Sequence, residues 1–241
     1  MQNQSKWLPS KYVQVNGDFR VTNDETKVGI GYRLIGNIQA KNYSILISKY
    51  AGGMLLDLGC GNVSLYEMYK DKVSGIYCAD WPNSFHTITF QDFHLNLNHP
   101  FPIKSETFNT IILTDVMEHI ANPLILWNEL ARILRPGGRI IIGVPFFHII
   151  HEEPYDYFRY TEYRLRLFCS ENKLKILELY SYGGSLEIIF DIIAKHISKF
   201  KIISKIHFIL ASVIINSFIG KKIFRLTASK YPLGYCMVVE K

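Results

Sequence analysis

Residues 54–64 read MLLDLGCGNVS, a short apolar run that contains an acid and ends in two closely spaced glycines. Such a run predicts a buried strand, and Gly59 and Gly61 let the chain turn tightly and a ligand approach the backbone. A dinucleotide-binding loop would need glycine where Ser64 stands, and the Asp57 carboxylate would repel a diphosphate. The stretch therefore favours a ligand with a cationic group. A glycine turn that only joins a strand to a helix is the alternative.

Short apolar runs alternate with helical patterns on both sides of this stretch. This alternation is typical of an α/β fold, in which an open, doubly wound parallel sheet carries helices on both faces. Asn122-Pro123 marks one helix start, and Pro136-Gly137-Gly138 marks its end. The expected strands are 54–58, 73–80, 87–93, 108–115, 139–145 and 174–182, and the expected helices are 31–50, 65–72, 123–134 and 160–173.

In such a sheet a ligand lies at the carboxyl edge of the strands, so the residues that follow each strand are the candidates for binding. Asp80 ends the second strand, where an acid can accept hydrogen bonds from a ribose diol. Trp81 beside it offers a flat face for an adenine ring. A surface Asp80 that starts a turn before Pro82 is the alternative.

Composition and charge exclude several classes of protein. With 48% hydrophobic and 20% charged residues, the 241-residue chain can bury a core and is neither disordered nor fibrous. The four cysteines are far apart in the sequence, which argues against a disulfide framework or a zinc ribbon. No secretory signal and no membrane-spanning run is recognised, so we expect a cytoplasmic protein. Residues 1–50, 51–170 and 171–241 carry net charges of +4, −4 and +6. The basic excess lies among Ile, Phe and Leu, which favours an anionic partner or a membrane face over nucleic acid.

Four segments in this order resemble a known family: LLDLGCG, the acid after the second strand, ILTDVMEHIANP, and ELARILRPGGRIIIGVPF. Together they look like the class I S-adenosylmethionine-dependent methyltransferases, and most like the type 11 methyltransferase-domain family. The resemblance covers about residues 50–185 and the terminal strand. It implies a Rossmann-like, mostly parallel seven-stranded sheet with an antiparallel last strand, and S-adenosyl-L-methionine as the cofactor. We expect an N-terminal arm (1–30), the methyltransferase core (31–185), a helical insert (186–230) and the last strand of the core (231–241).

The resemblance also implies roles for single residues at the strand ends. Three departures from the family pattern concern His94, which stands where an acid often contacts the adenine amine, Val63 in place of a third glycine, and Asn109 in place of an aspartate. By the family pattern, the methionine part of the cofactor would be held by Asp57, Gly59 and Gly61. The ribose would be bound by Asp80, and the adenine would be contacted by Trp81 and His94. The pocket near the sulfonium would be lined by Thr114 and Asp115.

Candidate catalytic and acceptor-binding residues follow the fourth and fifth strands. If the acceptor is a hydroxyl, a general base helps to remove its proton, and His119 and His151 are the candidates, with His148 nearby. Packing roles for these histidines are the alternative. Tyr155, Tyr157 and Arg159 are expected to shape the acceptor pocket. Arg159 would bind an anionic group of the substrate or pair with Glu152 or Glu153, and both interpretations stay open.

Two further features complete the prediction. Asp115, Glu118 and His119 resemble a magnesium motif of some O-methyltransferases, but the same pattern is common without metal, and we predict no metal. Residues 186–220 contain four lysines in an Ile-rich sequence, which fits an amphipathic helical pair on an anionic membrane surface. A cover over the acceptor pocket or an interface between identical chains is the alternative.

The function expected from the sequence is methyl transfer from S-adenosylmethionine to an oxygen of a small-molecule acceptor, with a nitrogen as the less favoured alternative. A saccharide or lipid-linked saccharide is favoured, because HEEPYDYFRYTEYRLRLFC resembles a stretch found in bacterial family members associated with cell-surface polysaccharide assembly. The rival hypotheses are a non-catalytic, methyltransferase-like scaffold subunit and an NAD-linked dehydrogenase.

Overall fold

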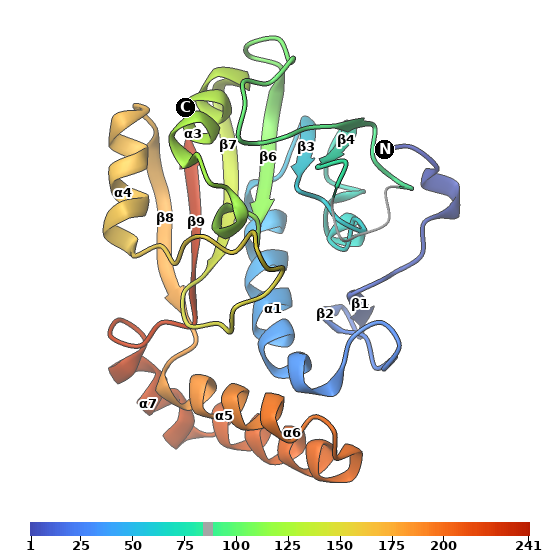
Figure 1. Cartoon of the computed structure of the whole chain (residues 1–241), viewed down its shortest axis with the longest axis vertical. Coiled ribbons are helices and arrows are strands. Elements are labelled where there is room, and N and C mark those ends of the chain that lie inside the picture. The colour runs from blue at the N-terminus through green and yellow to red at the C-terminus, as the bar shows by residue number, and fades with distance from the viewer. Residues whose placement is uncertain (84–88) are drawn as a thin grey trace.

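A seven-stranded sheet forms the centre of the molecule in a computed structural model that describes residues 1–83 and 89–241 (Figure 1). The strands are arranged in the order β5-β4-β3-β6-β7-β9-β8. β9 pairs antiparallel with both of its neighbours, and the other pairs are parallel. This confirms the Rossmann-like fold and the antiparallel last strand. The bounds are β3 (Met54–Leu58), β4 (Gly75–Asp80), β5 (Phe93–His94), β6 (Phe108–Thr114), β7 (Leu134–Pro145), β8 (Lys175–Tyr182) and β9 (Gly234–Glu240).

Helices cover both faces of this sheet. On one face Trp127 of α3 (Pro123–Ile133) stacks on Phe168 of α4 (Glu162–Glu171), with ring centroids 5.2 Å apart. On the other face α1 (Arg33–Tyr50) buries Tyr43, Leu46 and Ile47 beside the short helix α2 (Tyr66–Tyr69). The apolar strands between them are therefore shielded from water on both sides, as parallel sheets require.

The third strand is shorter than the sequence predicts. We expected it over 87–93; residues 87 and 88 lie outside the described residues, residues 89–92 form turns, and β5 is only Phe93–His94. The Asp92 side chain accepts the N–H of Cys78 at 2.8 Å and pairs with the amino group of Met1 at 3.0 Å. A side chain thus takes a backbone hydrogen bond of β4 that a longer parallel strand would use.

The N-terminal arm is more ordered than expected. It contains a 3-10 turn (Gln4–Lys6) and a hairpin of β1 (Tyr12–Val15) and β2 (Asp18–Val21). Trp7 and Tyr12 are buried in the same apolar cluster as α1 and α2. Trp7 also donates a hydrogen bond to the carbonyl of Val63 in the loop after β3, at 3.2 Å. The arm is therefore part of the core on this face of the sheet.

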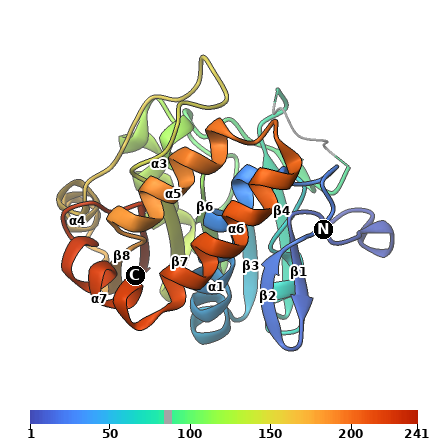
Figure 2. The ribbon, with the colours of Figure 1, turned by 90° about the horizontal axis from the view of Figure 1, so that it is seen from below.

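Residues 185–227 form three helices rather than the expected pair: α5 (Ser185–His196), α6 (Lys201–Asn216) and α7 (Phe218–Thr227). They form a layer at the end of the sheet toward which the parallel strands point (Figure 1), and Figure 2 shows them from below. α6 packs on α5, on α7 and on the 3-10 turn (Ile30–Tyr32) that precedes α1. The layer thus lies at the edge of the sheet where ligands bind in this class of fold.

Candidate active site

A cavity of about 760 Å³ opens at the carboxyl ends of the parallel strands. Its volume lies in the range of small-molecule and cofactor sites, roughly 300–1,000 Å³. The lining comes from the arm, the start of α1, the loops after β3, β6 and β7, and α5. Of the residues predicted for the site, Asp57, Gly59, Gly61, Thr114, Asp115, His119 and His151 line this one cavity.

Asp57 at the end of β3 is a buried carboxyl group that borders the cavity. Burial raises its pKa to about 7, although a hydrogen bond from the Tyr69 hydroxyl at 2.8 Å acts in the opposite direction. The chain turns immediately afterwards at Gly59, whose φ of +72° is accessible mainly to glycine. A Cβ at Gly59 would also lie 2.4 Å from Val116. The loop therefore requires a glycine there, and it holds Asp57 at the cavity wall.

Asp80 ends β4 and is oriented by the same loop. Its carboxylate accepts the N–H of Gly61 at 2.8 Å and the N–H of Trp81 at 2.7 Å. The Trp81 ring contacts Tyr155 edge to face, with centroids 5.0 Å apart. His94 pairs with Asp80 in the strand register, and its side chain is exposed. The predicted ribose and adenine residues thus lie together at the ends of β4 and β5, beside the Gly61 backbone.

Asp115 follows β6 with φ +55°, an uncommon backbone conformation for a residue other than glycine. Its carboxylate accepts hydrogen bonds from Gln39 Nε2 at 3.0 Å and from the Tyr43 hydroxyl at 3.0 Å, and Lys11 Nζ lies 4.0 Å away. None of these three partners was expected from the sequence. The signal was present for Gln39 and Tyr43, two polar groups at i and i+4 on the buried face of α1.

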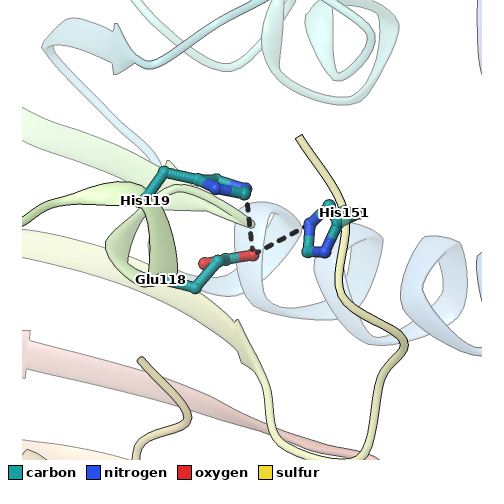
Figure 3. Close-up of side chains that lie close together, drawn as sticks. All are labelled: Glu118, His119 and His151. Atoms are coloured by element: carbon teal, nitrogen blue, oxygen red, sulfur yellow. Dashed lines mark ion pairs between the residues drawn. The ribbon is translucent and has the colours of Figure 1, made fainter. Parts of the chain in front are cut away.

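A second polar group lies deeper, where Glu118, His119 and His151 converge (Figure 3). Glu118 Oε1 is 3.8 Å from His119 Nε2 and 3.9 Å from His151 Nε2. Glu118 is fully buried, and neither carboxylate oxygen has a hydrogen-bond partner among residues 1–83 and 89–241. Burial and then the nearby Asp115 carboxylate raise the pKa of Glu118 well above its ordinary value. Sequence reasoning considered Glu118 only as a metal ligand.

His151 is positioned by Asp156, a residue that the sequence analysis quoted but did not assign. Asp156 Oδ2 accepts the His151 backbone N–H at 3.0 Å and lies 3.3 Å from its Nδ1. Burial opposes ionisation of Asp156, but hydrogen bonds from Arg159 and from the His151 backbone outweigh it and lower the pKa of Asp156 to about 2. Arg159 therefore pairs with Asp156 in the structure, rather than with Glu152 or Glu153.

The other two histidines are held nearby. His119 Nδ1 lies 3.0 Å from the Tyr155 carbonyl, and burial lowers the pKa of His119. His148 contacts the His151 ring at 5.0 Å between centroids. Burial and the Lys195 ammonium lower the pKa of His148 to about 3, so its ring is neutral at ordinary pH.

A second hollow of about 360 Å³ shares His148 with the main cavity. Tyr157 and Arg159 line this hollow, whereas Tyr155 packs on Trp81. The three predicted acceptor residues are thus divided between two places. The full lining is Phe146, Phe147, His148, Ile150, Asp156, Tyr157, Phe158 and Arg159.

The three residues that resemble a magnesium motif do not come together as a ligand set in the described residues, because the Asp115 carboxylate binds Gln39 and Tyr43 of α1 and lies 4.0 Å from Lys11 of the arm. In its place Glu118, His119 and His151 present one ligand atom each within 4.8 Å of one another. A carboxylate with two imidazoles suits a transition-metal cation better than magnesium. Neighbouring ligands of one such ion, bound at about 2.1 Å in tetrahedral geometry, lie about 3.4 Å apart. The Glu118–His119 and Glu118–His151 distances are wider than this.

Comparison with known proteins gives a match to one family model and several solved structures of similar fold. The family model described as a methyltransferase domain matches residues 56–142, from β3 to β7. An S-adenosylmethionine-dependent methyltransferase from Mesorhizobium loti superposes with a TM-score of 0.56 at 10% identity, over 86% of this chain and 100% of that one. A search of curated protein sequences finds no match.

Two further solved structures share the fold at low identity. Haemonchus contortus phosphoethanolamine N-methyltransferase 2 superposes with a TM-score of 0.53 at 14% identity, over 90% of this chain and 58% of that one. The [4+2]-cyclase SpnF superposes with a TM-score of 0.55 at 12% identity, over 86% and 83%. The predicted Rossmann-like fold of the class I S-adenosylmethionine-dependent methyltransferases is confirmed. That a cyclase shares the fold means that the reaction has to be argued from the site.

The residues of the cavity fit S-adenosylmethionine, the cofactor expected from the sequence. Asp57 and Asp115 border the cavity with carboxyl groups, which suit the cationic amino-acid end of the molecule. The Asp115 carboxylate at the wall of the same cavity would repel a diphosphate. The cavity therefore favours S-adenosylmethionine over a dinucleotide.

Proposed function

We propose that this chain transfers the methyl group of S-adenosylmethionine to a hydroxyl oxygen of a small-molecule acceptor, with a saccharide or lipid-linked saccharide as the favoured class. The observation that supports this most directly is that one cavity is lined both by the Asp57–Gly61 loop and by His119 and His151. A cofactor held by the loop would therefore share its space with two candidate bases.

The cofactor supplies an electrophilic methyl group on a sulfonium, so the protein has to bind, orient and deprotonate. Asp57 would bind the cationic amino-acid end of the cofactor. The Asp80 carboxylate would accept hydrogen bonds from the ribose hydroxyls, and the hydrogen bond from the Gly61 N–H holds this carboxylate in position. Placing the acceptor oxygen in line with the S–CH₃ bond, at about 3 Å, is worth several kcal/mol of the barrier. Removing the proton of a hydroxyl acceptor requires a base at the same point.

His151 is the base in this proposal, and Asp156 is its positioning residue. Asp156 stays ionised, because Arg159 donates to it, and its Oδ2 lies 3.3 Å from His151 Nδ1. A proton held at Nδ1 leaves Nε2 free to accept the proton of the acceptor, the arrangement of a base oriented by a carboxylate. The ring centroids of His119 and His151 lie 4.7 Å apart. His119 would therefore receive the acceptor's proton from His151 or relay it.

The hollow beside His148 supports the saccharide class. Phe146, Phe147, Tyr157 and Phe158 give it aromatic walls, on which the apolar C–H faces of sugar rings pack. Arg159 adds a cation, although it already binds Asp156 and would contact an acceptor anion only with its remaining N–H groups.

The test combines calorimetry with a transfer assay. S-adenosylmethionine is titrated into the protein, and labelled methyl transfer is then screened over cell-envelope sugars, nucleotide sugars and lipid-linked saccharides. His151→Gln and Asp156→Asn should each lower kcat by about 10²-fold or more with cofactor affinity nearly unchanged, and Asp156→Asn should also shift the pH–rate profile. His99→Gln, an exposed histidine away from the cavity, is the matched control.

Other outcomes would redirect the assignment. Cofactor binding without transfer to any acceptor would favour the non-catalytic scaffold subunit, and binding of NAD in place of S-adenosylmethionine would favour a dehydrogenase. Full activity of both His151→Gln and Asp156→Asn would remove these residues from the mechanism.

The proposed base needs no metal ion. We therefore expect dialysis against EDTA to leave the methyl-transfer rate unchanged, because His151 and Asp156 move the proton themselves. Loss of activity that zinc or manganese restores would instead assign Glu118, His119 and His151 as a ligand set. Glu118→Gln should then abolish the restoration.

A further inference from the structure

Helix α6 carries its apolar residues on the side that faces away from the protein. Ser204 and Ala211, seven residues apart, are its buried residues. Ile202, Ile206, Ile209 and Val213 follow the spacing i, i+4, i+7, i+11, which places them on one helix face opposite those two. Their exposed fractions are 76, 53, 60 and 64%. This polarity is the reverse of an ordinary surface helix, whose apolar stripe packs on the core.

The exposed apolar surface continues on both sides of this stripe. Phe200 before α6 is 60% exposed, and Phe218, Ile219 and Leu226 of α7 are 83, 68 and 67% exposed. We call the exposed residues of 200–226 the α6–α7 face. Monomeric soluble proteins rarely expose contiguous apolar surface on this scale, and such surfaces mark sites of protein or membrane interaction.

Charge distinguishes between these two partners. Residues 192–239 contain no Asp or Glu, and they contain eight Lys and Arg residues. Lys221, Lys222 and Arg225 of α7 are exposed beside the apolar residues, and Lys199 and Lys230 flank the face. Two copies of this face would bring like charges together, whereas an anionic lipid surface complements both the cations and the apolar side chains.

The geometry indicates how the helices would meet a bilayer. No single helix of the described part of the chain is long and apolar enough to cross a membrane, and α6 and α7 reach that length only as a pair bent by 75°. A helix with an apolar stripe beside lysines suits the interface, where it lies parallel to the membrane plane.

We propose that the α6–α7 face docks on the surface of an anionic bilayer, with Ile202, Ile206, Ile209 and Val213 at the boundary between headgroups and acyl chains. The layer of α5, α6 and α7 lies below the carboxyl edge of the sheet (Figures 1 and 2). Within this layer, Asp191 of α5 borders the cavity. Docking would hold the cavity about one helix layer, roughly 10 Å, from the membrane. Use of a lipid-linked acceptor there rests on the proposed function, but docking itself does not.

The test measures flotation of the full chain with vesicles, without cofactor or acceptor. We expect binding to phosphatidylcholine vesicles that contain phosphatidylglycerol, much weaker binding to pure phosphatidylcholine, and weakening with salt as the charges are screened. The triple variant Ile202→Gln, Ile206→Gln, Ile209→Gln and the double variant Lys221→Glu, Lys222→Glu should each reduce the bound fraction at least tenfold. Because all five substituted side chains are exposed, both variants should keep the fold of the unaltered protein. Thermal melting and calorimetry with S-adenosylmethionine would verify this.

Matched controls use exposed residues elsewhere on the molecule. Ile45→Gln with Leu124→Gln, and Lys72→Glu with Lys175→Glu, should bind vesicles like the unaltered protein. The proposal would be overturned if the two α6–α7 variants bound vesicles as well as the unaltered protein does, or if the unaltered protein bound no vesicles. A dimer in light scattering that the triple variant disperses would assign the face to a second copy of the chain instead. None of these outcomes depends on methyl transfer, so docking and the proposed reaction can fail separately.

Discussion

At the scale of single residues, the site depends on carboxyl groups in unlike surroundings. Asp156 is kept ionised by Arg159, whereas burial favours the protonated form of Asp57 and of Glu118. Such divergence is typical of functional sites, because binding a cation and orienting a base need different carboxyl groups. Of these three carboxyl groups, Asp57 is the one whose pKa burial raises to about 7.

We expect cofactor affinity to depend on the charge of Asp57. A cationic ligand favours the carboxylate, so affinity should rise by up to about tenfold per pH unit below about pH 7 and level off above it. Calorimetry with S-adenosylmethionine from about pH 5.5 to about pH 7.5 measures the slope. Asp57→Asn should bind more weakly and lose most of the slope, while Asp18→Asn on the exposed β2 strand should keep it. An unchanged slope in Asp57→Asn would place the titrating group elsewhere.

The same carboxyl group links stability to pH. Because burial raises the pKa of Asp57 from its unfolded value near 4 to about 7, its contribution is fully present below about pH 4 and is lost as pH rises through 7. Asp57→Asn cannot lose a proton, so its Tm should exceed that of the unaltered protein at pH 8 by several degrees more than at pH 4. Thermal melts of both proteins at the two pH values test this. A constant difference would show that Asp57 is not buried as described.

At the scale of secondary structure, the N-terminal arm supports the cofactor loop. Trp7 packs on Tyr66 with ring centroids 4.7 Å apart and donates to the carbonyl of Val63. Val63 has φ +51°, a strained conformation for a β-branched residue, at the place where the related family has glycine. We infer that the arm stabilises this conformation of the loop.

Trp7→Ala should therefore affect both stability and binding. Removal of a buried tryptophan costs about 3 kcal/mol of unfolding free energy, and relaxation of the Val63 turn should weaken cofactor binding. Denaturant melts and calorimetry measure the two effects. Leu8→Ala, at a neighbouring side chain that is 74% exposed, is the control and should change neither. Destabilisation with unchanged cofactor affinity would separate the arm from the site.

The contact between α1 and β7 helps to position Asp115, because it holds Tyr43, which donates a hydrogen bond to Asp115. Gly143 of β7 faces Tyr43, and a Cβ there would lie 2.4 Å from the Tyr43 hydroxyl oxygen. Gly143→Ala should displace the tyrosine that donates to Asp115, which lowers stability by about 1–3 kcal/mol and weakens cofactor binding. Gly52→Ala, where a Cβ meets nothing within 4 Å, should have little effect. Melts and titrations of the two variants make the comparison, and equal behaviour would show that Tyr43 moves at no cost.

At the scale of the whole molecule, the cavity is built by parts that are distant in sequence. Lys11 comes from the arm, Gln39 from α1, Asp57 from the sheet and Asp191 from α5, and all four border the same space. A ligand in this space would contact several layers of the fold at once. It should therefore stabilise the native state as a unit.

We expect S-adenosylmethionine at a hundredfold its Kd to raise the unfolding free energy by about 2.7 kcal/mol, which gives a higher Tm in a thermal-shift assay. NAD should give no shift. Asp80→Ala should reduce affinity by about 1–3 kcal/mol, the scale of hydrogen bonds to a charged acceptor, and shift the concentration dependence accordingly. A shift with NAD and none with S-adenosylmethionine would reverse the assignment of the cofactor.

The order of strands and helices, the glycine turn after β3 and the acid after β4 could all be predicted from the sequence. These features rest on local patterns, since apolar periodicity and turn residues act over a few positions of the chain. The length of β5 was less predictable, because the Asp92 side chain competes for a backbone hydrogen bond of the neighbouring strand β4.

Only the tertiary structure decided which polar groups meet. Asp156 with His151, Glu118 between two imidazoles, and Gln39 and Tyr43 on Asp115 are contacts whose formation depends on how separate segments pack. The same holds for α6, since the periodicity of a helix shows that it has an apolar side but not which way that side faces. Packing placed Ser204 and Ala211 inward and the isoleucines outward, because small side chains let α6 approach α5 and the turn before α1 closely.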